Sequence, residues 1–138
     1  NYPASIVKAK ILSAKNESIK AEEILRDLLI KKNKDPGIWM QLSEIQRSGK
    51  NIVGYHLSKG EYFLLIGDFQ NALNQFQFAF GLSGHSFQTS ETILTKIKYA
   101  KERIANKKGF QEEISSLGTI FNPNKARKPA KGIAINGM

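Results

Sequence analysis

The sequence contains no cysteine and only four prolines, and its glycines are scattered rather than clustered. The lack of cysteine excludes disulfide bonds, thiolate zinc sites and a cysteine nucleophile. With so few prolines, most of the chain can form helices, and the few breakers can serve as joints. No apolar run approaches the roughly 20 residues that span a bilayer, the longest being residues 62–66. We therefore expect a helical chain without a transmembrane segment.

The charge is strongly basic and unevenly distributed. The chain has 21 basic and 12 acidic side chains, which gives a net charge of +9. Six of the bases but only two of the acids lie in residues 105–138. Four of these bases follow residue 121, with no acid among them, and we call them the basic tail: Lys125, Arg127, Lys128 and Lys131. Such bases can neutralise phosphates on nucleic acid or anionic lipid, although no base-reading motif accompanies them.

Apolar residues recur at three- and four-residue intervals along six segments, which predicts six helices. These helices cover roughly residues 4–14, 18–31, 36–48, 52–66, 69–82 and 87–107. Connections of only a few residues favour antiparallel neighbours. The sequence thus predicts an all-α fold, an antiparallel helix-hairpin array that needs no strand.

Capping residues and glycines mark the helix boundaries. Asp35-Pro36 predicts a helix start, because aspartate caps free amides and proline fits the first turn. We expect Asn51 to cap the following helix. Gly49 and Gly67 are expected to end helices in the left-handed conformation.

The periodic pattern decays beyond Gly109, and Asn122-Pro123-Asn124 interrupts what remains of it. We expect a helical repeat domain over residues 1–108. Residues 109–138 are predicted to form a C-terminal extension, a short helix or turn followed by a flexible tail. The chain starts at Asn1 without a charged-then-apolar export signal, which we interpret as the start of a processed or excised fragment.

Small and bulky residues in residues 52–86 follow the offsets of the 34-residue tetratricopeptide pattern. The small residues are Gly60, Ala72 and Ala79, and the bulky ones are Phe63 and Phe76. Shifted back by 51 residues, the template falls on Ala9, Leu12, Ala21, Leu25 and Leu28. The chain therefore resembles tetratricopeptide repeats, and the resemblance implies a right-handed superhelix of about six to seven helices, with one extra half repeat. We expect Phe63, Phe76 and Phe80 in the core, and Phe78 off the apolar stripe.

A more specific resemblance rests on the stretch from Asp35 (Asp-Pro-Gly-Ile-Trp-Met-Gln-Leu-Ser-Glu) and on the stretch from Gly49 to Ala72, with its Gly-Asp joint. Together they resemble the C-terminal repeat domain of BepA-like periplasmic zinc metallopeptidases over roughly residues 2–105. The resemblance implies a bacterial, periplasmic scaffold that recognises clients or docks on the outer-membrane assembly machinery. It also implies that the catalytic His-Glu-x-x-His domain lies outside this chain.

No residue pattern in the chain predicts catalysis, a cofactor or a metal. Zinc needs three or four convergent ligands, and the two histidines, His56 and His85, are 29 residues apart. No serine lies in a Gly-x-Ser-x-Gly turn, and the glycine motifs that cradle phosphates are missing. We therefore predict a chain that is not itself an enzyme.

A helical array offers a concave surface, lined by the first helix of each hairpin, that binds peptides. The repeat register points the following residues toward it: Lys10, Met40, Glu44, Arg47, Leu57, Glu61 and Leu65. An equally weighted alternative is that several of them only contact the next helix. Their mixed charge predicts protein or peptide clients rather than a ligand of one sign.

Two other classes of function stay open. The basic tail supports binding to nucleic acid or an anionic membrane, and the array supports a free-standing structural adaptor that self-associates as a homo-oligomer. We expect no sequence-specific nucleic-acid binding, because base-reading motifs are lacking.

Overall fold

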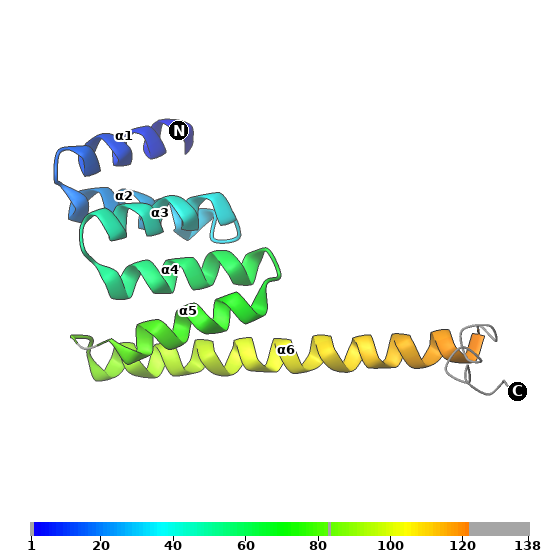
Figure 1. Cartoon of the computed structure of the whole chain (residues 1–138). Helices are drawn as coiled ribbons and strands as arrows, with labels where there is room; N and C mark the ends of the chain where they lie inside the picture. Colours follow the sequence, from blue (N-terminus) through cyan, green and yellow to red (C-terminus); the bar gives the residue numbers. More distant parts are fainter. Residues whose placement is uncertain (1, 83, 122–138) are drawn as a thin grey trace, which may run out of the picture. The chain divides into compact units, whose positions relative to one another are not determined.

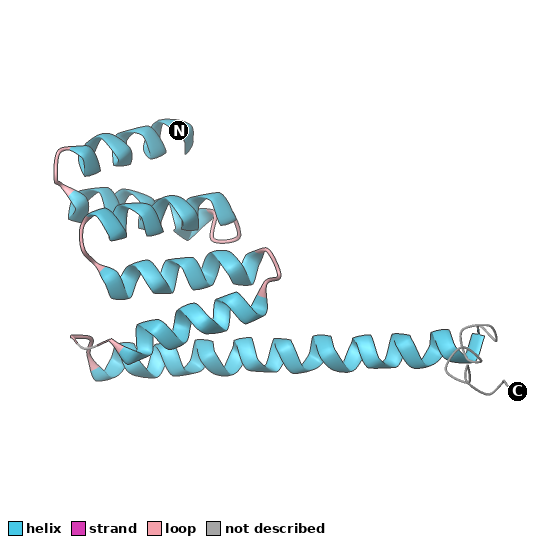
Figure 2. Ribbon diagram, viewed as in Figure 1, coloured by secondary structure: helices cyan, strands magenta, loops and turns pink. Residues whose placement is uncertain are grey.

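The computed structural model of the chain describes residues 2–82 and 84–121, and all the regular elements within them are α-helices (Figure 2). The helices are α1 (Tyr2–Ala14), α2 (Ser18–Lys31), α3 (Pro36–Ser48), α4 (Ile52–Leu65), α5 (Phe69–Gly81) and α6 (Phe87–Phe121). The predicted all-α class is confirmed. Among the described residues, no helix combines the length and the apolar character that crossing a membrane requires.

The chain divides into two compact units, residues 1–102 and residues 103–138. The sequence predicts a boundary between domain and extension after residue 108. In the first unit, α1 to α5 form an array of antiparallel hairpins in which each helix packs on the next (Figure 1). The first and third helices, α1 and α3, also contact each other directly.

Buried aliphatic residues hold the first three helices together. This core comprises Ala9, Ala21, Leu25, Leu29, Ile38, Leu42 and Ile45. Each fully buried leucine or isoleucine contributes roughly 1.5–3 kcal/mol relative to an exposed one. Ala9 and Ala21, two of the small residues that the repeat template selects, are completely buried here.

In the hairpin of α4 and α5, a glycine of α4 packs directly against an aromatic ring of α5. Gly60 is buried, and a β-carbon at this position would lie 2.2 Å from Cε1 of the fully buried Phe76. Phe76 therefore belongs to the core as predicted. Phe63 is only half-buried, and the prediction for Phe80 is wrong, because 42% of it is exposed. Phe78, predicted to lie off the stripe, is 58% exposed.

The predicted caps form where a carboxylate or amide side chain precedes a helix. Asp35 accepts a hydrogen bond from the Gly37 amide at 2.9 Å, and Asn51 accepts one from the Gly54 amide at 3.1 Å. Gly67 ends α4 with a positive φ of 82°, as expected. Gly49 differs.

At the end of α3, the left-handed residue is Lys50, with a φ of 63°, whereas Gly49 has a φ of −84°. A glycine fits at position 49 because a larger side chain would collide with a neighbouring helix. A β-carbon there would lie 2.5 Å from Cβ of Ser18, at the start of α2.

The last helix, α6, is much longer than the sequence predicts. We expect it to end near residue 107, but it continues through Gly109 to Phe121. A glycine inside a helix costs only about 1 kcal/mol relative to alanine. The lysines and glutamates around Gly109 are strong helix formers, so one glycine does not end the helix. The predicted flexible tail lies outside the described residues.

Candidate functional site

A pocket of about 290 Å³ lies between α1 and α3, on the side where these two helices meet. Five of its lining residues carry polar side chains, with apolar stems that also line it, and the sixth is the buried Ile45. The lining comprises Lys10, Ser13, Gln41, Glu44, Ile45 and Ser48. The two helices are not consecutive in the chain, so the pocket exists only because α2 folds between them. It contains two of the residues that the repeat register predicts for the binding surface, Lys10 and Glu44.

A third predicted residue, Arg47, does not line the pocket but forms an ion pair with Glu44, which does. Its Nη2 donates a hydrogen bond to Oε1 of Glu44 at 2.6 Å. This hydrogen bond and the negative charge of Glu44 raise the pKa of Arg47 above its ordinary value. Both side chains are about half exposed, so water screens the pair and its effect on stability is small. The pair thus places opposite charges at the edge of the pocket, and both side chains stay exposed enough to contact a ligand.

The remaining predicted groove residues do not all join this surface. Met40 is half-buried on α3, and its carbonyl oxygen accepts a hydrogen bond from Oγ of Ser43 at 2.7 Å. On α4, Leu57 is half-buried and Leu65 is 37% exposed. Glu61 forms an ion pair with Lys96, in the third turn of α6. The α4 part of the predicted surface is therefore engaged with α6 at Glu61, whereas Lys10, Glu44 and Arg47 stay together.

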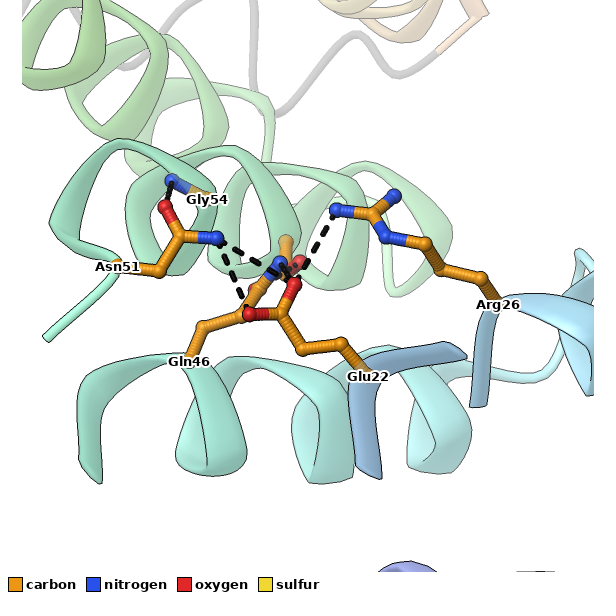
Figure 3. Close-up of polar contacts among 6 residues, drawn as sticks. Glu22, Arg26, Gln46, Asn51 and Gly54 are labelled. Atoms are coloured by element: carbon orange, nitrogen blue, oxygen red, sulfur yellow. Dashed lines mark hydrogen bonds and ion pairs between the residues drawn. The ribbon is translucent and has the colours of Figure 1, made fainter. Parts of the chain in front are cut away.

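A second polar feature links α2, α3 and α4 and is not predicted from the sequence (Figure 3). At its centre is Gln46, which is completely buried. Its Nε2 donates to Oε1 of Glu22 at 3.1 Å, and its Oε1 accepts from Oγ of Ser58 at 2.6 Å. Asn51, at the N-terminus of α4, donates to both carboxylate oxygens of Glu22 at 3.3 and 3.2 Å.

The Glu22 carboxylate also receives Nη2 of Arg26 at 3.5 Å, so it faces donors from three elements. Three of these contacts are to Oε1 and one is to Oε2. A small pocket of about 280 Å³ opens beside the cluster, between Ile19 and Asn51. Because its donors and acceptors are paired with one another, the cluster joins helices rather than presenting an open reactive group.

The start of α1 and the end of α2 enclose an open cleft of about 520 Å³ with several charged groups on its rim. The Tyr2 hydroxyl donates to Oδ2 of Asp35 at 2.6 Å, and Nζ of Lys32 lies 5.2 Å from the centre of the Tyr2 ring. The hydrogen bond from Tyr2 lowers the pKa of Asp35, and the same bond raises the pKa of Tyr2. The contacts fasten the first residues of α1 to the cap of α3.

The two histidines make separate local contacts. Nδ1 of His56 lies 2.8 Å from Oε1 of Gln75, and its ring stacks obliquely on the exposed Phe78 at 5.4 Å between centres. His85 instead contacts Ser90 and the Phe80 carbonyl oxygen. Within residues 2–82 and 84–121, no group of three or more potential metal ligands comes together.

The other predicted site, the basic tail of Lys125, Arg127, Lys128 and Lys131, lies outside the described residues. Comparison with protein-family models, curated proteins and solved structures finds no match for this chain.

Proposed function

We propose that the chain is a non-catalytic repeat module that binds a protein or peptide segment, and that the pocket between α1 and α3 is its binding site. The observation that supports this most directly is the composition of the pocket. It carries an exposed lysine, an exposed glutamate with its arginine partner, and neutral polar groups above a buried isoleucine. A peptide offers matching groups, because its backbone and side chains carry donors, acceptors and both signs of charge.

The opposite charges of Lys10 and Glu44 predict how a peptide is oriented in the pocket. Lys10 on α1 faces a carboxylate or carbonyl oxygen of the ligand, and Glu44 on α3 faces a basic side chain or backbone amide. Electrostatic complementarity of this kind contributes mainly to specificity and to the rate of association. We expect a segment that carries both an acidic and a basic side chain to bind better than one of either sign alone.

A peptide selection followed by calorimetry tests this function. Peptides are selected against the purified chain from a random phage-displayed library, and a selected peptide is titrated by isothermal calorimetry. We expect Lys10→Glu and Glu44→Lys each to weaken binding roughly tenfold, as for loss of one charged contact. The matched control is Lys15→Glu, which makes the same charge change at an exposed position just after α1.

The proposal fails if the control variant weakens binding as much as Lys10→Glu does. It also fails if both pocket variants bind the selected peptide like the original chain. A charge-swapped chain with Lys10→Glu and Glu44→Lys together distinguishes direct contact from unfolding, since it keeps the net charge and should select peptides of reversed charge order.

We further propose that this module recognises clients for an exported metallopeptidase, with the outer-membrane assembly machinery as a docking partner. The resemblance of residues 35–79 to BepA-like repeat domains supports this, and it also suggests a periplasmic location. The reading frame upstream of Asn1 tests the idea. An export signal and a His-Glu-x-x-His helix there would support it, and a short upstream sequence without them would leave a free-standing adaptor.

A further inference from the structure

The start of α1 and the end of α2 enclose a cleft whose rim is rich in lysine. This is the open cleft of about 520 Å³ described above, and all of its lining residues belong to the first unit. Its volume falls within the range of about 300–1,000 Å³ that is typical of ligand sites. We call it the lysine cleft. Its apolar lining is Tyr2, Ile24 and Leu28, and its charged lining is Lys8, Asp27, Lys31 and Lys32.

The floor of the lysine cleft is apolar and is held in place by the core. Tyr2, Ile24 and Leu28 are half-buried, and all three pack against the buried residues of the first three helices. The Tyr2 hydroxyl also donates to Asp35, which fastens the ring to the cap of α3. A ligand that covers this floor with an aliphatic or aromatic side chain removes apolar surface from water.

Three exposed lysines stand on the rim of the cleft, Lys8, Lys31 and Lys32. Lysines near the end of a helix such as α2 are common, because they offset the partial negative charge of the helix C-terminus. Lys8 has no such role, since it lies in the middle of α1. Within the part of the chain that the structure describes, neither Lys8 nor Lys31 forms an ion pair. Lys32 lies over the Tyr2 ring, 5.2 Å from its centre.

The carboxylates near the cleft do not balance these lysines. Asp27 is the only acidic residue among the lining residues. Asp35 lies in the adjacent turn, where both of its oxygens already accept hydrogen bonds, Oδ1 from the Gly37 amide and Oδ2 from Tyr2. The same turn adds the exposed Lys34. Cleft and turn together thus hold four lysines and two aspartates, and this surface attracts anions.

We propose that the lysine cleft binds an acidic segment of another polypeptide. An aliphatic or aromatic side chain of this segment covers the floor, and carboxylates on either side of it meet Lys8 and Lys31. Complementary charges of this kind raise the rate of association and exclude partners of the wrong sign. The site is separate from the pocket between α1 and α3, because Lys8 and Lys10 lie about 160° apart around α1. The proposal therefore does not rest on peptide binding at that pocket.

Two other anionic partners fit the cleft less well. A nucleic acid carries a phosphate at every nucleotide, which would bring negative charge against Asp27, and it has no aliphatic side chain for Ile24 and Leu28. An anionic membrane would reach the exposed lysines, but its headgroups form a wide polar layer that would leave the half-buried floor uncovered. A short acidic segment with one apolar side chain matches both the rim and the floor.

Fluorescence anisotropy with a short synthetic probe tests the proposal. The probe is rhodamine-labelled Gly-Glu-Glu-Leu-Glu-Glu-Gly, and it is mixed with the whole chain at low salt. We expect binding that weakens as salt is added. A matched peptide with glutamine in place of every glutamate should bind at least about tenfold more weakly. A second matched peptide, with serine in place of leucine, should bind at least about threefold more weakly. No binding of the probe at low salt, or equal binding of either matched peptide, would overturn the proposal.

Charge variants of the chain separate the cleft from the general positive charge. The double variant Lys8→Glu with Lys31→Glu should bind the probe at least about tenfold more weakly, since two attractive charges become repulsive. The matched control is Lys15→Glu with Lys101→Glu, which makes the same change in net charge at exposed positions outside the cleft. The control should lower the affinity less than about threefold, because distant exposed charges are screened. Asp27→Asn should instead strengthen binding about two- to fivefold, a gain that unfolding cannot produce. Equal losses in the two double variants, or no gain in Asp27→Asn, would contradict the proposal.

NMR spectroscopy of the isotope-labelled chain locates the bound probe. We expect the largest shifts of amide signals within residues 2–8 and 24–34. Shifts confined to residues 10–13 and 41–48 would assign the probe to the pocket between α1 and α3 and would overturn the proposal. We also expect that neither a single-stranded oligonucleotide nor phosphatidylglycerol vesicles displace the probe as well as the unlabelled peptide does. Equal displacement by one of them would assign the cleft to that ligand instead.

Discussion

Gly60→Ala is the substitution whose cost the structure defines most sharply. The added methyl carbon would lie 2.2 Å from Cε1 of Phe76 and 2.6 and 2.7 Å from Cδ1 and Cζ. Favourable contacts between carbons need about 3.5–4.0 Å. The Phe76 ring is fully buried, so it cannot swing into solvent, and α4 and α5 must separate instead.

Two opposing terms set the size of the effect. Alanine is favoured over glycine inside a helix by about 1 kcal/mol. Overpacking of a filled core costs about 1–3 kcal/mol, and the very short contacts at Gly60 place this case in the upper part of that range. We expect a net loss in the free energy of unfolding of about 1–2 kcal/mol.

Urea unfolding followed by far-ultraviolet circular dichroism measures this loss as a fall in the midpoint of roughly 0.5–1 M. Gly81→Ala is the matched control, since a β-carbon there meets no atom within 4 Å, and its midpoint should stay the same or rise slightly. In a Phe76→Leu background, the smaller side chain should relieve Gly60→Ala by at least about 1 kcal/mol. A Gly60→Ala chain as stable as the original, or strictly additive effects with Phe76→Leu, would refute the close-packing argument.

Two further predictions concern the polar contacts. Gln46→Ala leaves the buried Ser58 hydroxyl without the acceptor that Gln46 provides. It also removes one donor from the Glu22 carboxylate, which keeps its contacts with Asn51 and Arg26. Unfolding by urea should therefore show a loss of about 1–3 kcal/mol; a loss below about 0.5 kcal/mol would contradict the hydrogen bonds at Gln46. The lowered pKa of Asp35 means that its hydrogen bond from Tyr2 stabilises the fold above the ordinary carboxyl pKa, and that this contribution is lost as the pH falls through the lowered pKa. The difference in melting temperature between the original chain and Tyr2→Phe should therefore be constant near neutral pH and shrink in acid; a difference that grows in acid would show that the sign is wrong.

Much of the array could be predicted because its signals are local. Helix starts at Asp35 and Asn51 are encoded by side chains that cap the next few amides, and the repeat offsets selected Ala9, Gly60 and Phe76 as packing positions. The end of α6 could not be predicted, since a single Gly109 costs too little to stop a helix and the pattern around it is weak. Local sequence predicts a backbone role for Gly49, but it cannot show that Ser18, which is distant in sequence, lies against it.

The candidate site was only partly predictable for the same reason. Lys10 and Glu44 share a pocket because the register places both on the first helices of their hairpins. Glu61 has the same register position, but it pairs with Lys96, which lies 35 residues later in the chain. The contacts of Gln46 depend on partners 24 and 12 residues away in sequence, which no periodic pattern specifies.

The buried Gln46 amide also fixes how the hairpins can be arranged. Its nitrogen end faces Glu22 of α2 and its oxygen end faces Ser58 of α4. The Ser58 hydroxyl can donate or accept, but a carboxylate can only accept, so turning the amide over would bring its oxygen against the Glu22 carboxylate. Apolar surfaces alone would tolerate a shift of one helical turn between α3 and either neighbouring helix. Such a shift would leave the buried Gln46 amide without one of its hydrogen-bond partners. The three helices consequently behave as one cooperative block, so a cut in the loop between α2 and α3 should not release two stable halves, and helix pairs in this part of the chain cannot be exchanged like interchangeable modules.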